Sequence, residues 1–188
     1  HAAAVALPAA SRHSAPVAVR TLAKALPIWS KRAMQRSIFV TGAASGIGRA
    51  TARLFAERGW LVGLVDFDDE GVRRTAAELA PAQVWVGDLD VTDYPAYERV
   101  MAAFGERSGG RLDVLFNCAG VLRQSAFEDL SRADEQTILN VNVLGVSNGV
   151  HAALPLLKAT PGSHVVSMSS SAAIYGVPEE AMYSASKF

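Results

Sequence analysis

The chain has 188 residues, of which 50% are hydrophobic and 19% charged, and its formal net charge is +0. This composition is typical of a soluble globular domain that is long enough to bury a substantial core. The charge is uneven, because residues 1–36 contain six basic residues and no acidic residue, which leaves 12 basic against 18 acidic residues in the remainder. An acidic domain without a basic stripe argues against a nucleic-acid partner.

Cysteine, histidine and hydropathy patterns exclude further classes of protein. Cys118 is the only cysteine, so neither an intramolecular disulfide nor a thiolate metal cluster is expected. The four histidines are scattered without neighbouring ligands, and we therefore expect no metal site. No uncharged apolar run approaches the length of a bilayer span. These patterns predict a cytoplasmic protein without a membrane partner.

Residues 1–36 form a basic, alanine-rich extension that fits no core element, and Pro8, Pro16 and Pro27 interrupt any long helix in it. Such a segment is typical of a disordered or non-native extension, and an organellar or export signal is the alternative. The chain begins with His1 and stops at Phe188 within an expected helix. We therefore expect a fragment whose single domain, over residues 37–188, is incomplete at its C-terminus.

A glycine-rich turn follows the first expected strand. Residues 37–40 form a short apolar run without polar alternation, which predicts a strand buried on both faces. Gly42, Gly46 and Gly48 follow, and apolar residues then recur at helical spacing up to Gly59. Strand, glycine turn and helix N-terminus together bind a pyrophosphate, because backbone N–H groups and the helix dipole face its negative charge. A turn that merely connects a strand to a helix is the alternative.

Asp66 ends the next apolar run, over residues 60–65, at about 20 residues beyond the glycines. A carboxylate at this position binds the adenosine ribose hydroxyls and repels a 2′-phosphate. Ser45, directly before Gly46, brings no positive charge that would offset the repulsion. The sequence therefore favours NAD over NADP as the cofactor.

The rest of the chain continues to alternate between strands and helices. Strands are expected over residues 83–86, 112–116 and 164–168. This alternation predicts an α/β fold with a doubly wound, Rossmann-like parallel sheet, whose ligands bind beyond the carboxyl ends of the strands. Five glycine or polar residues lie at or just after the expected strand ends: Gly42, Asp66, Asp90, Asn117 and Ser170.

Two helical patterns carry polar residues at defined places. A capping box of Ser131 and Asp134 begins one helix, and Pro155 and Pro161 mark its kinked end. One face of that helix is small or apolar apart from a single asparagine: Ile138, Asn142, Gly145, Gly149 and Ala153.

Tyr183 and Lys187 are four residues apart and share the face of the last expected helix. A nearby ammonium stabilises a phenolate and lowers the tyrosine pKa, which would make Tyr183 a usable acid and base. An ordinary exposed pair is the alternative that this spacing alone leaves open.

Residues 37–188 resemble the short-chain dehydrogenase/reductase family, in its single-domain branch with TGxxxGxG and YxxxK motifs. Cys118 departs from the second asparagine of the family's NNAG motif, and Ser170, 13 residues before Tyr183, fits the spacing of the family serine better than Ser169 or Ser171. The residues that carry the resemblance are the turn from Thr41 to Gly48, Asp66, Asp90, Val91, Asn117, Cys118, Ala119, Gly120, Asn142, Ser170, Tyr183 and Lys187.

The resemblance implies an oxidoreductase that transfers a hydride between a small secondary alcohol or ketone and NAD, with NADP the less favoured cofactor. Tyr183 would act as general acid and base, and Lys187 would lower its pKa and hold the nicotinamide ribose. Ser170 would bind the substrate oxygen, and Asn142 would anchor a water in a proton relay. The implied cofactor-binding residues are Gly42, Ser45, Gly46, Ile47, Gly48, Asp66, Asp90, Val91, Asn117, Ala119, Gly120, Tyr183 and Lys187. Members of the family commonly form dimers or tetramers, and we expect the same here through the helices near Ser131 and Tyr183.

Two other functional interpretations remain open at this point. A non-catalytic nucleotide-binding or scaffolding protein would have the same fold, although it would not need the asparagine, serine, tyrosine and lysine together. The fragment itself is expected to be inactive, because a chain that stops at Phe188 leaves its fifth strand as an open edge. The loop over residues 172–182 would contribute Ile174 and Tyr175 either to an apolar pocket wall or to packing beneath the loop. The sequence does not identify the substrate.

Overall fold

Five parallel strands form one sheet in the order β3-β2-β1-β4-β5 in the computed structural model of the chain, which describes residues 35–188. Most of the expected N-terminal extension, residues 1–34, lies outside the described residues. The order confirms the predicted doubly wound parallel sheet, because β1 pairs with β2 on one side and with β4 on the other. The strands are β1 (Ser37–Thr41), β2 (Leu61–Asp66), β3 (Val84–Asp88), β4 (Val114–Asn117) and β5 (His164–Ser167).

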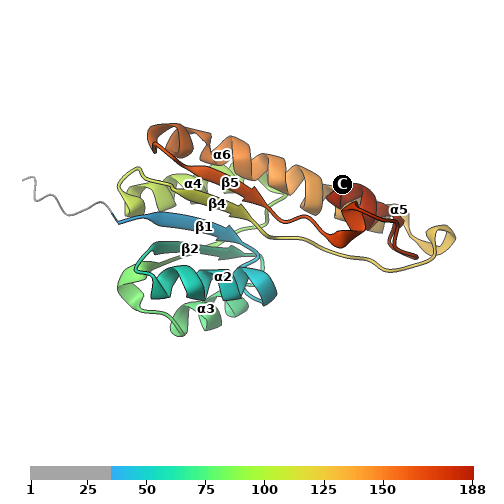
Figure 1. Cartoon of the computed structure of the whole chain (residues 1–188), viewed down its shortest axis with the longest axis horizontal. Helices are drawn as coiled ribbons and strands as arrows, with labels where there is room; N and C mark the ends of the chain where they lie inside the picture. The colour runs from blue at the N-terminus through green and yellow to red at the C-terminus, as the bar shows by residue number, and fades with distance from the viewer. Residues whose placement is uncertain (1–34) are drawn as a thin grey trace, which may run out of the picture. The chain divides into compact units, whose positions relative to one another are not determined.

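Helices cover both faces of this sheet (Figure 1). Helices α2 and α3 lie on one face, α4 and α6 lie on the other, and α5 and α7 lie beyond the carboxyl ends of the strands. None of the helices in residues 35–188 is both long and apolar enough to cross a membrane. The helices are α2 (Gly46–Glu57), α3 (Asp69–Ala77), α4 (Tyr94–Ser108), α5 (Arg132–Leu139), α6 (Gly145–Ala159) and α7 (Ala181–Lys187).

Side chains that precede the helices determine where three of them begin. Asp68 accepts a hydrogen bond from the Gly71 N–H at the start of α3. Asp93 accepts one from the Ala96 N–H at the start of α4. Ser131 accepts from the Asp134 N–H and donates to its carboxylate, which confirms the predicted capping box of α5. Each cap satisfies an N–H group that the first helical turn leaves without an acceptor.

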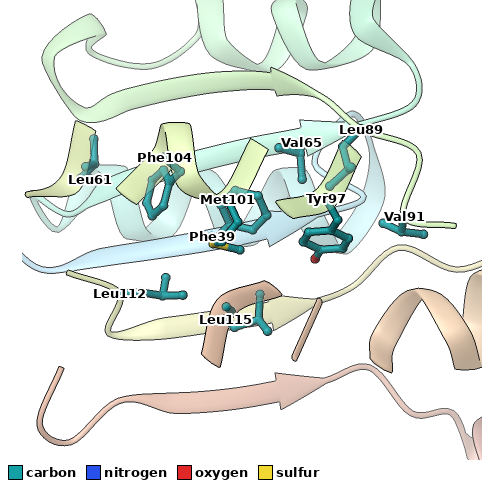
Figure 2. Close-up of a cluster of buried hydrophobic side chains, with 11 residues drawn as sticks. Phe39, Leu61, Val65, Leu89, Val91, Tyr97, Met101, Phe104, Leu112 and Leu115 are labelled. Atoms are coloured by element: carbon teal, nitrogen blue, oxygen red, sulfur yellow. The ribbon is translucent and has the colours of Figure 1, made fainter. Parts of the chain in front are cut away.

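The larger apolar core lies between the sheet and helices α4 and α6. Figure 2 shows Phe39 of β1 beside Met101 and Phe104 of α4, all fully buried or nearly so. The rings of Phe39 and Phe104 meet edge to face with centroids 5.2 Å apart. A Cβ on Gly63 of β2 would lie 2.8 Å from both rings, so a glycine there lets them approach the sheet. Burying the side chain of Phe39, Met101 or Phe104 contributes about 1.5–3 kcal/mol each to the stability of the fold.

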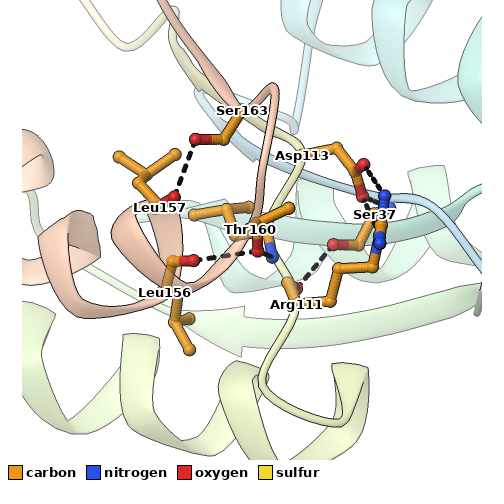
Figure 3. Close-up of polar contacts among 8 residues, drawn as sticks. Ser37, Arg111, Asp113, Leu156, Leu157, Thr160 and Ser163 are labelled. Carbon is orange, nitrogen blue, oxygen red and sulfur yellow. Dashed lines mark hydrogen bonds and ion pairs between the residues drawn. The ribbon is translucent and has the colours of Figure 1, made fainter.

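A polar cluster explains why β4 begins two residues later than predicted. The Leu112 N–H donates to the Thr160 hydroxyl, which donates in turn to the Leu156 carbonyl (Figure 3). The Asp113 carboxylate accepts from the Ser37 N–H and pairs with Arg111. These side-chain contacts fasten the start of β4 to the end of α6 before the regular pairing of β4 begins.

One prediction near α6 is corrected, and one segment there was not predicted. Pro155 lies inside α6, which continues to Ala159 instead of ending in a kink at the proline. A five-residue π-helical segment, Asn140–Leu144, joins α5 to α6, and the sequence pattern did not indicate it. The predicted face of this helix is correct, because its five members are all buried: Ile138, Asn142, Gly145, Gly149 and Ala153.

The last strand, β5, is an open edge of the sheet within residues 35–188, as the sequence analysis expected. Every residue of β5 is exposed, and Val165 and Val166 are 44% and 46% exposed. Apolar edge strands of this kind pair readily with other strands.

Candidate functional site

The glycine turn between β1 and α2 is closely packed at two of its glycines and open at the third. A Cβ on Gly48 would lie 2.1 Å from the Gly42 carbonyl oxygen, and one on Gly42 would lie 2.9 Å from the Ala119 nitrogen. Gly46 has a φ of +51° and no atom within 4 Å of the corresponding position. Ser45 precedes α2 and makes no side-chain cap hydrogen bond. The first turn of α2 therefore borders open space, and a helix N-terminus of this kind attracts an anion.

Thr41 fastens this turn to the segment that follows β4. Its hydroxyl oxygen accepts hydrogen bonds from the N–H groups of Cys118 and Ala119, each 3.0 Å long. The sequence analysis quoted Thr41 as part of the glycine motif but missed this role, since only the strand order reveals that β1 and β4 are neighbours.

Asp66 and Asp90 lie at the carboxyl ends of β2 and β3. The Asp66 carboxylate accepts from the Ala44 N–H of the glycine turn at 3.0 Å and from the Asp68 N–H at 3.1 Å. Asp90 is exposed and accepts from both the N–H and the hydroxyl of Thr92. Val91 is buried against Gly145, where a Cβ would lie 2.7 Å from the valine side chain. The edge beside the glycine turn therefore carries two carboxylates.

Asn142 lies in the π-helical segment and joins two parts of the chain. Its Oδ1 accepts from the Val121 N–H at 2.8 Å, and its Nδ2 donates to the Val121 carbonyl and to the Ser186 hydroxyl, both at 2.9 Å. The amide thus ties the segment after β4 to α7. π-Helical segments commonly occur at functional sites, where the wider turn redirects a side chain.

Lys187 lies beside Asn142, and Gly120 separates them. A Cβ on Gly120 would lie 3.2 Å from Lys187 Nζ and 3.3 Å from Asn142 Oδ1. Lys187 Nζ donates to the Met168 carbonyl at 3.1 Å and lies 5.8 Å from the centroid of the Tyr183 ring. Burial lowers the pKa of the Lys187 ammonium, although the neighbouring Cys118 opposes this shift. The structure therefore brings Asn142, Tyr183 and Lys187 together.

Ser170 lies on the segment after β5 that contacts α7. Its hydroxyl oxygen accepts from the Ala172 N–H at 3.2 Å. The adjacent Ser169 hydroxyl donates to the Lys187 carbonyl at 3.0 Å, which holds this segment against α7. Ile174 and Tyr175, which follow, are 84% and 61% exposed, so they do not pack beneath the loop.

Asn117 and Cys118 lie between the glycine turn and Lys187. Asn117 is 2% exposed, and its Nδ2 donates to the Ser167 hydroxyl at 3.4 Å. Cys118 is half-buried. Burial raises the pKa of its thiol, and the Lys187 ammonium and the Gly48 N–H act in the opposite direction.

A family model described as "short chain dehydrogenase" matches residues 36–188. The chain is 36% identical over 150 residues to 3-oxoacyl-[acyl-carrier-protein] reductase FabG of Thermotoga maritima, a match that covers 79% of this chain and 61% of the relative. It is 35% identical to meso-2,3-butanediol dehydrogenase of Serratia marcescens, with 80% and 59% of the two chains covered. The chain thus spans about three fifths of the length of the curated relatives it matches.

The fold is also similar to that of solved structures. A short-chain dehydrogenase/reductase from Burkholderia phymatum, crystallised in complex with NAD, aligns with a TM-score of 0.77 at 32% identity over 81% of this chain and 55% of that one. A protein described as a short-chain dehydrogenase/reductase and glucose/ribitol dehydrogenase from Brucella melitensis aligns with the same TM-score at 35% identity, over 81% of this chain and 61% of that one.

Proposed function

Because this chain belongs to the short-chain dehydrogenase/reductase family, we propose that the full-length protein is an oxidoreductase that transfers a hydride between a small secondary alcohol or ketone and NAD. The observation that carries the proposal is that Asn142 and Lys187 lie beside Gly120, with the Tyr183 ring centroid 5.8 Å from Lys187 Nζ. The adjacent Ala119 lies against the glycine turn. A lysine and a tyrosine that share a face next to a phosphate-binding turn are suited to proton transfer at a bound dinucleotide.

The donor groups at the turn fit the pyrophosphate of a dinucleotide. Gly46 borders open space, and the Ser45 hydroxyl makes no cap bond and is available to a ligand. The segment after β4 lies against the same turn through Thr41. The residues that would hold the cofactor are Gly42, Ser45, Gly46, Ile47, Gly48, Asp66, Asp90, Val91, Asn117, Ala119, Gly120, Tyr183 and Lys187.

The charges around Asp66 support NAD in preference to NADP. The Asp66 carboxylate adjoins the turn, and a 2′-phosphate on the adenosine ribose would meet its negative charge. Arg49, the first basic residue after the glycines, is paired with Glu78. Arg74, on the neighbouring helix α3, is paired with Asp68. Both guanidinium groups are therefore already paired with carboxylates.

The reacting groups would divide the work by chemical type. Bound NAD would supply the hydride acceptor at its nicotinamide ring. Tyr183 would take the proton of the substrate hydroxyl as the hydride leaves the carbon, and would return it in the reverse direction. Lys187 would stabilise the phenolate of Tyr183 and hold the nicotinamide ribose. Ser170 would donate a hydrogen bond to the substrate oxygen.

The surroundings of Ser170 support an apolar wall for the rest of the substrate. Ile174 and Tyr175 lie a few residues beyond Ser170 and are exposed.

We also propose that the full-length protein is a dimer or tetramer through α5, α6 and α7. Val143 and Leu144, which are 43% and 53% exposed on the segment between α5 and α6, support this surface.

Removing the Tyr183 hydroxyl tests the proposed activity most simply. In the full-length protein we expect Tyr183→Phe to reduce turnover of secondary alcohols with NAD by about 10²–10⁴-fold, because the acid and base is lost. NADH binding, followed by fluorescence, is expected to change little. Tyr94→Phe, which removes a partly exposed hydroxyl from α4, is the control. Unchanged turnover in Tyr183→Phe would contradict the role of Tyr183, and absence of both turnover and NADH binding in the unsubstituted protein would favour a scaffold.

A further inference from the structure

Two polar atoms in the larger core have no hydrogen-bond partner, and they face the same glycine. These atoms are the Tyr97 hydroxyl of α4 and the Asn117 Oδ1 at the end of β4. A Cβ on Gly149 of α6 would lie 2.7 Å from the hydroxyl and 2.5 Å from Oδ1. Both atoms therefore border the same small space, which is open because residue 149 is a glycine.

Their chemistry is complementary. Burial raises the pKa of Tyr97 far above its usual range, so the phenol remains protonated and retains its hydrogen. Asn117 Oδ1 is an acceptor, since the other end of the amide already donates to the Ser167 hydroxyl. Figure 2 shows the Tyr97 ring held among apolar side chains, with its oxygen on the side that faces β4. A buried donor and a buried acceptor without other partners gain most by bonding to each other.

We propose that a small adjustment of the two side chains lets the Tyr97 hydroxyl donate to Asn117 Oδ1, the two atoms that the structure leaves without partners. Tyr97 is thereby a positioning residue for Lys187, because this bond would fix the strand end on which the lysine is anchored. This inference deepens the proposed function and rests on it for the role of Lys187. Tyr97 does not contact the substrate or the cofactor in this account.

The connection from Asn117 to Lys187 consists of hydrogen bonds present in the structure. The Asn117 carbonyl accepts from the Met168 N–H at 2.9 Å, and the Asn117 side chain holds the preceding Ser167. The Met168 carbonyl accepts from Lys187 Nζ at 3.1 Å. A fixed Asn117 amide therefore fixes the end of β5, and that end holds the ammonium beside Tyr183.

Competitive acetylation of lysines tests the proposal without requiring enzyme activity. The full-length protein and its variants are labelled with isotope-coded acetic anhydride, and the ratio of Lys187 to Lys158 modification is measured by mass spectrometry. Lys158 is exposed near the end of α6 and serves as the internal reference. We expect Tyr97→Phe to raise the ratio about threefold, because a loosened Met168 carbonyl leaves the amine more accessible.

Three variants separate positioning from general destabilisation. Tyr94→Phe removes a hydroxyl from the rim of the same helix and is expected to leave the ratio unchanged. Asn117→Ala removes the acceptor and is expected to raise the ratio like Tyr97→Phe, and the double variant to raise it no further. All variants are labelled well below their unfolding temperatures. An unchanged ratio in Tyr97→Phe, or effects that add in the double variant, would overturn the proposal.

The activity assay tests the proposed function, and the labelling ratio tests the positioning role of Tyr97 independently of it. If the full-length protein has no oxidoreductase activity, the proposed function fails, and the labelling ratio still decides whether Tyr97 positions Lys187. If the protein is active, kcat per folded molecule is expected to fall about threefold in Tyr97→Phe, in parallel with the labelling change. An unchanged kcat alongside a changed labelling ratio would overturn the catalytic relevance of this positioning.

Discussion

The carboxyl edge of the sheet is built in two different ways on its two sides. Beside β1 and β2, backbone packing determines the geometry, because Gly42 and Gly48 lie within contact distance of neighbouring main-chain atoms. Beside β5 and α7, the side-chain hydrogen bonds of Asn142 and Lys187 determine it. The geometry of the glycine turn is therefore a product of the fold, whereas the side that carries Asn142 and Lys187 depends on individual polar contacts.

The largest expected effect is at Gly48, where backbone packing is closest. We expect Gly48→Ala to lower the free energy of unfolding by about 3 kcal/mol, because the new Cβ would lie 2.1 Å from the Gly42 carbonyl oxygen. Gly46→Ala is the matched control. It places a Cβ in open space and costs only the left-handed backbone conformation, about 1–2 kcal/mol. Urea unfolding measures the free energy of unfolding of both variants. Equal losses of stability in Gly48→Ala and Gly46→Ala would contradict the distinction between the two glycines.

An intermediate effect is expected at Asn142, on the side that depends on side-chain contacts. Asn142→Ala removes hydrogen bonds to the main chain of Val121 and to the Ser186 hydroxyl. We expect a loss of about 2 kcal/mol in urea unfolding, since the Val121 groups lose their partner. Asn148→Ala, which removes one bond from a half-buried residue to the Val91 carbonyl, should cost about 1 kcal/mol. A loss in Asn142→Ala no larger than the loss in Asn148→Ala would show that Asn142 does not hold α7.

The smallest effect is a pH dependence at Lys187. Burial lowers the pKa of Lys187 below the 10.5 of the unfolded chain, so the unfolded state binds more protons between these two values. The contribution of Lys187 to the free energy of unfolding therefore rises with pH between its folded-state pKa and 10.5. Below that range Lys187 is charged in both states, and burial of its charge lowers the stability of the folded protein. We expect the stability of the unsubstituted protein relative to Lys187→Met to increase as the pH rises towards 10.5. Thermal melts at several pH values measure the trend, and a trend of opposite sign would refute it.

The sequence predicted the fold well because each strand end carries its own local signal. The glycines, Asp66 and the capping box of Ser131 are recognisable within a few residues of sequence. The π-helical segment was not predictable, because its residues Asn140–Leu144 follow the same apolar periodicity as the helices on either side. The start of β5 was predicted correctly, and its end was predicted one residue too far along the chain. Both ends of β4 were displaced, and its start contacts partners such as Thr160 that come from a distant part of the chain.

Individual site residues differ in the same way. The proximity of Tyr183 and Lys187 was predictable from their spacing on one helix. The bridge from Thr41 to the Cys118 and Ala119 N–H groups was not, because it joins residues 77 and 78 positions apart along the chain. Tyr97, Met101 and Phe104 recur at helical spacing along the buried face of α4. The position of Tyr97 near Asn117 instead depends on how three elements pack around Gly149.

The most direct test of the account is a comparison of NADH and NADPH binding to the full-length protein, by fluorescence titration at one pH and salt concentration. If Asp66 faces the adenosine ribose, NADH binds at least about tenfold more tightly than NADPH, because the 2′-phosphate meets a carboxylate. The Asp66→Ala variant should then lose most of this preference. Equal affinities, or tighter binding of NADPH, would contradict the assignment of Asp66 and with it the proposal of NAD as the cofactor.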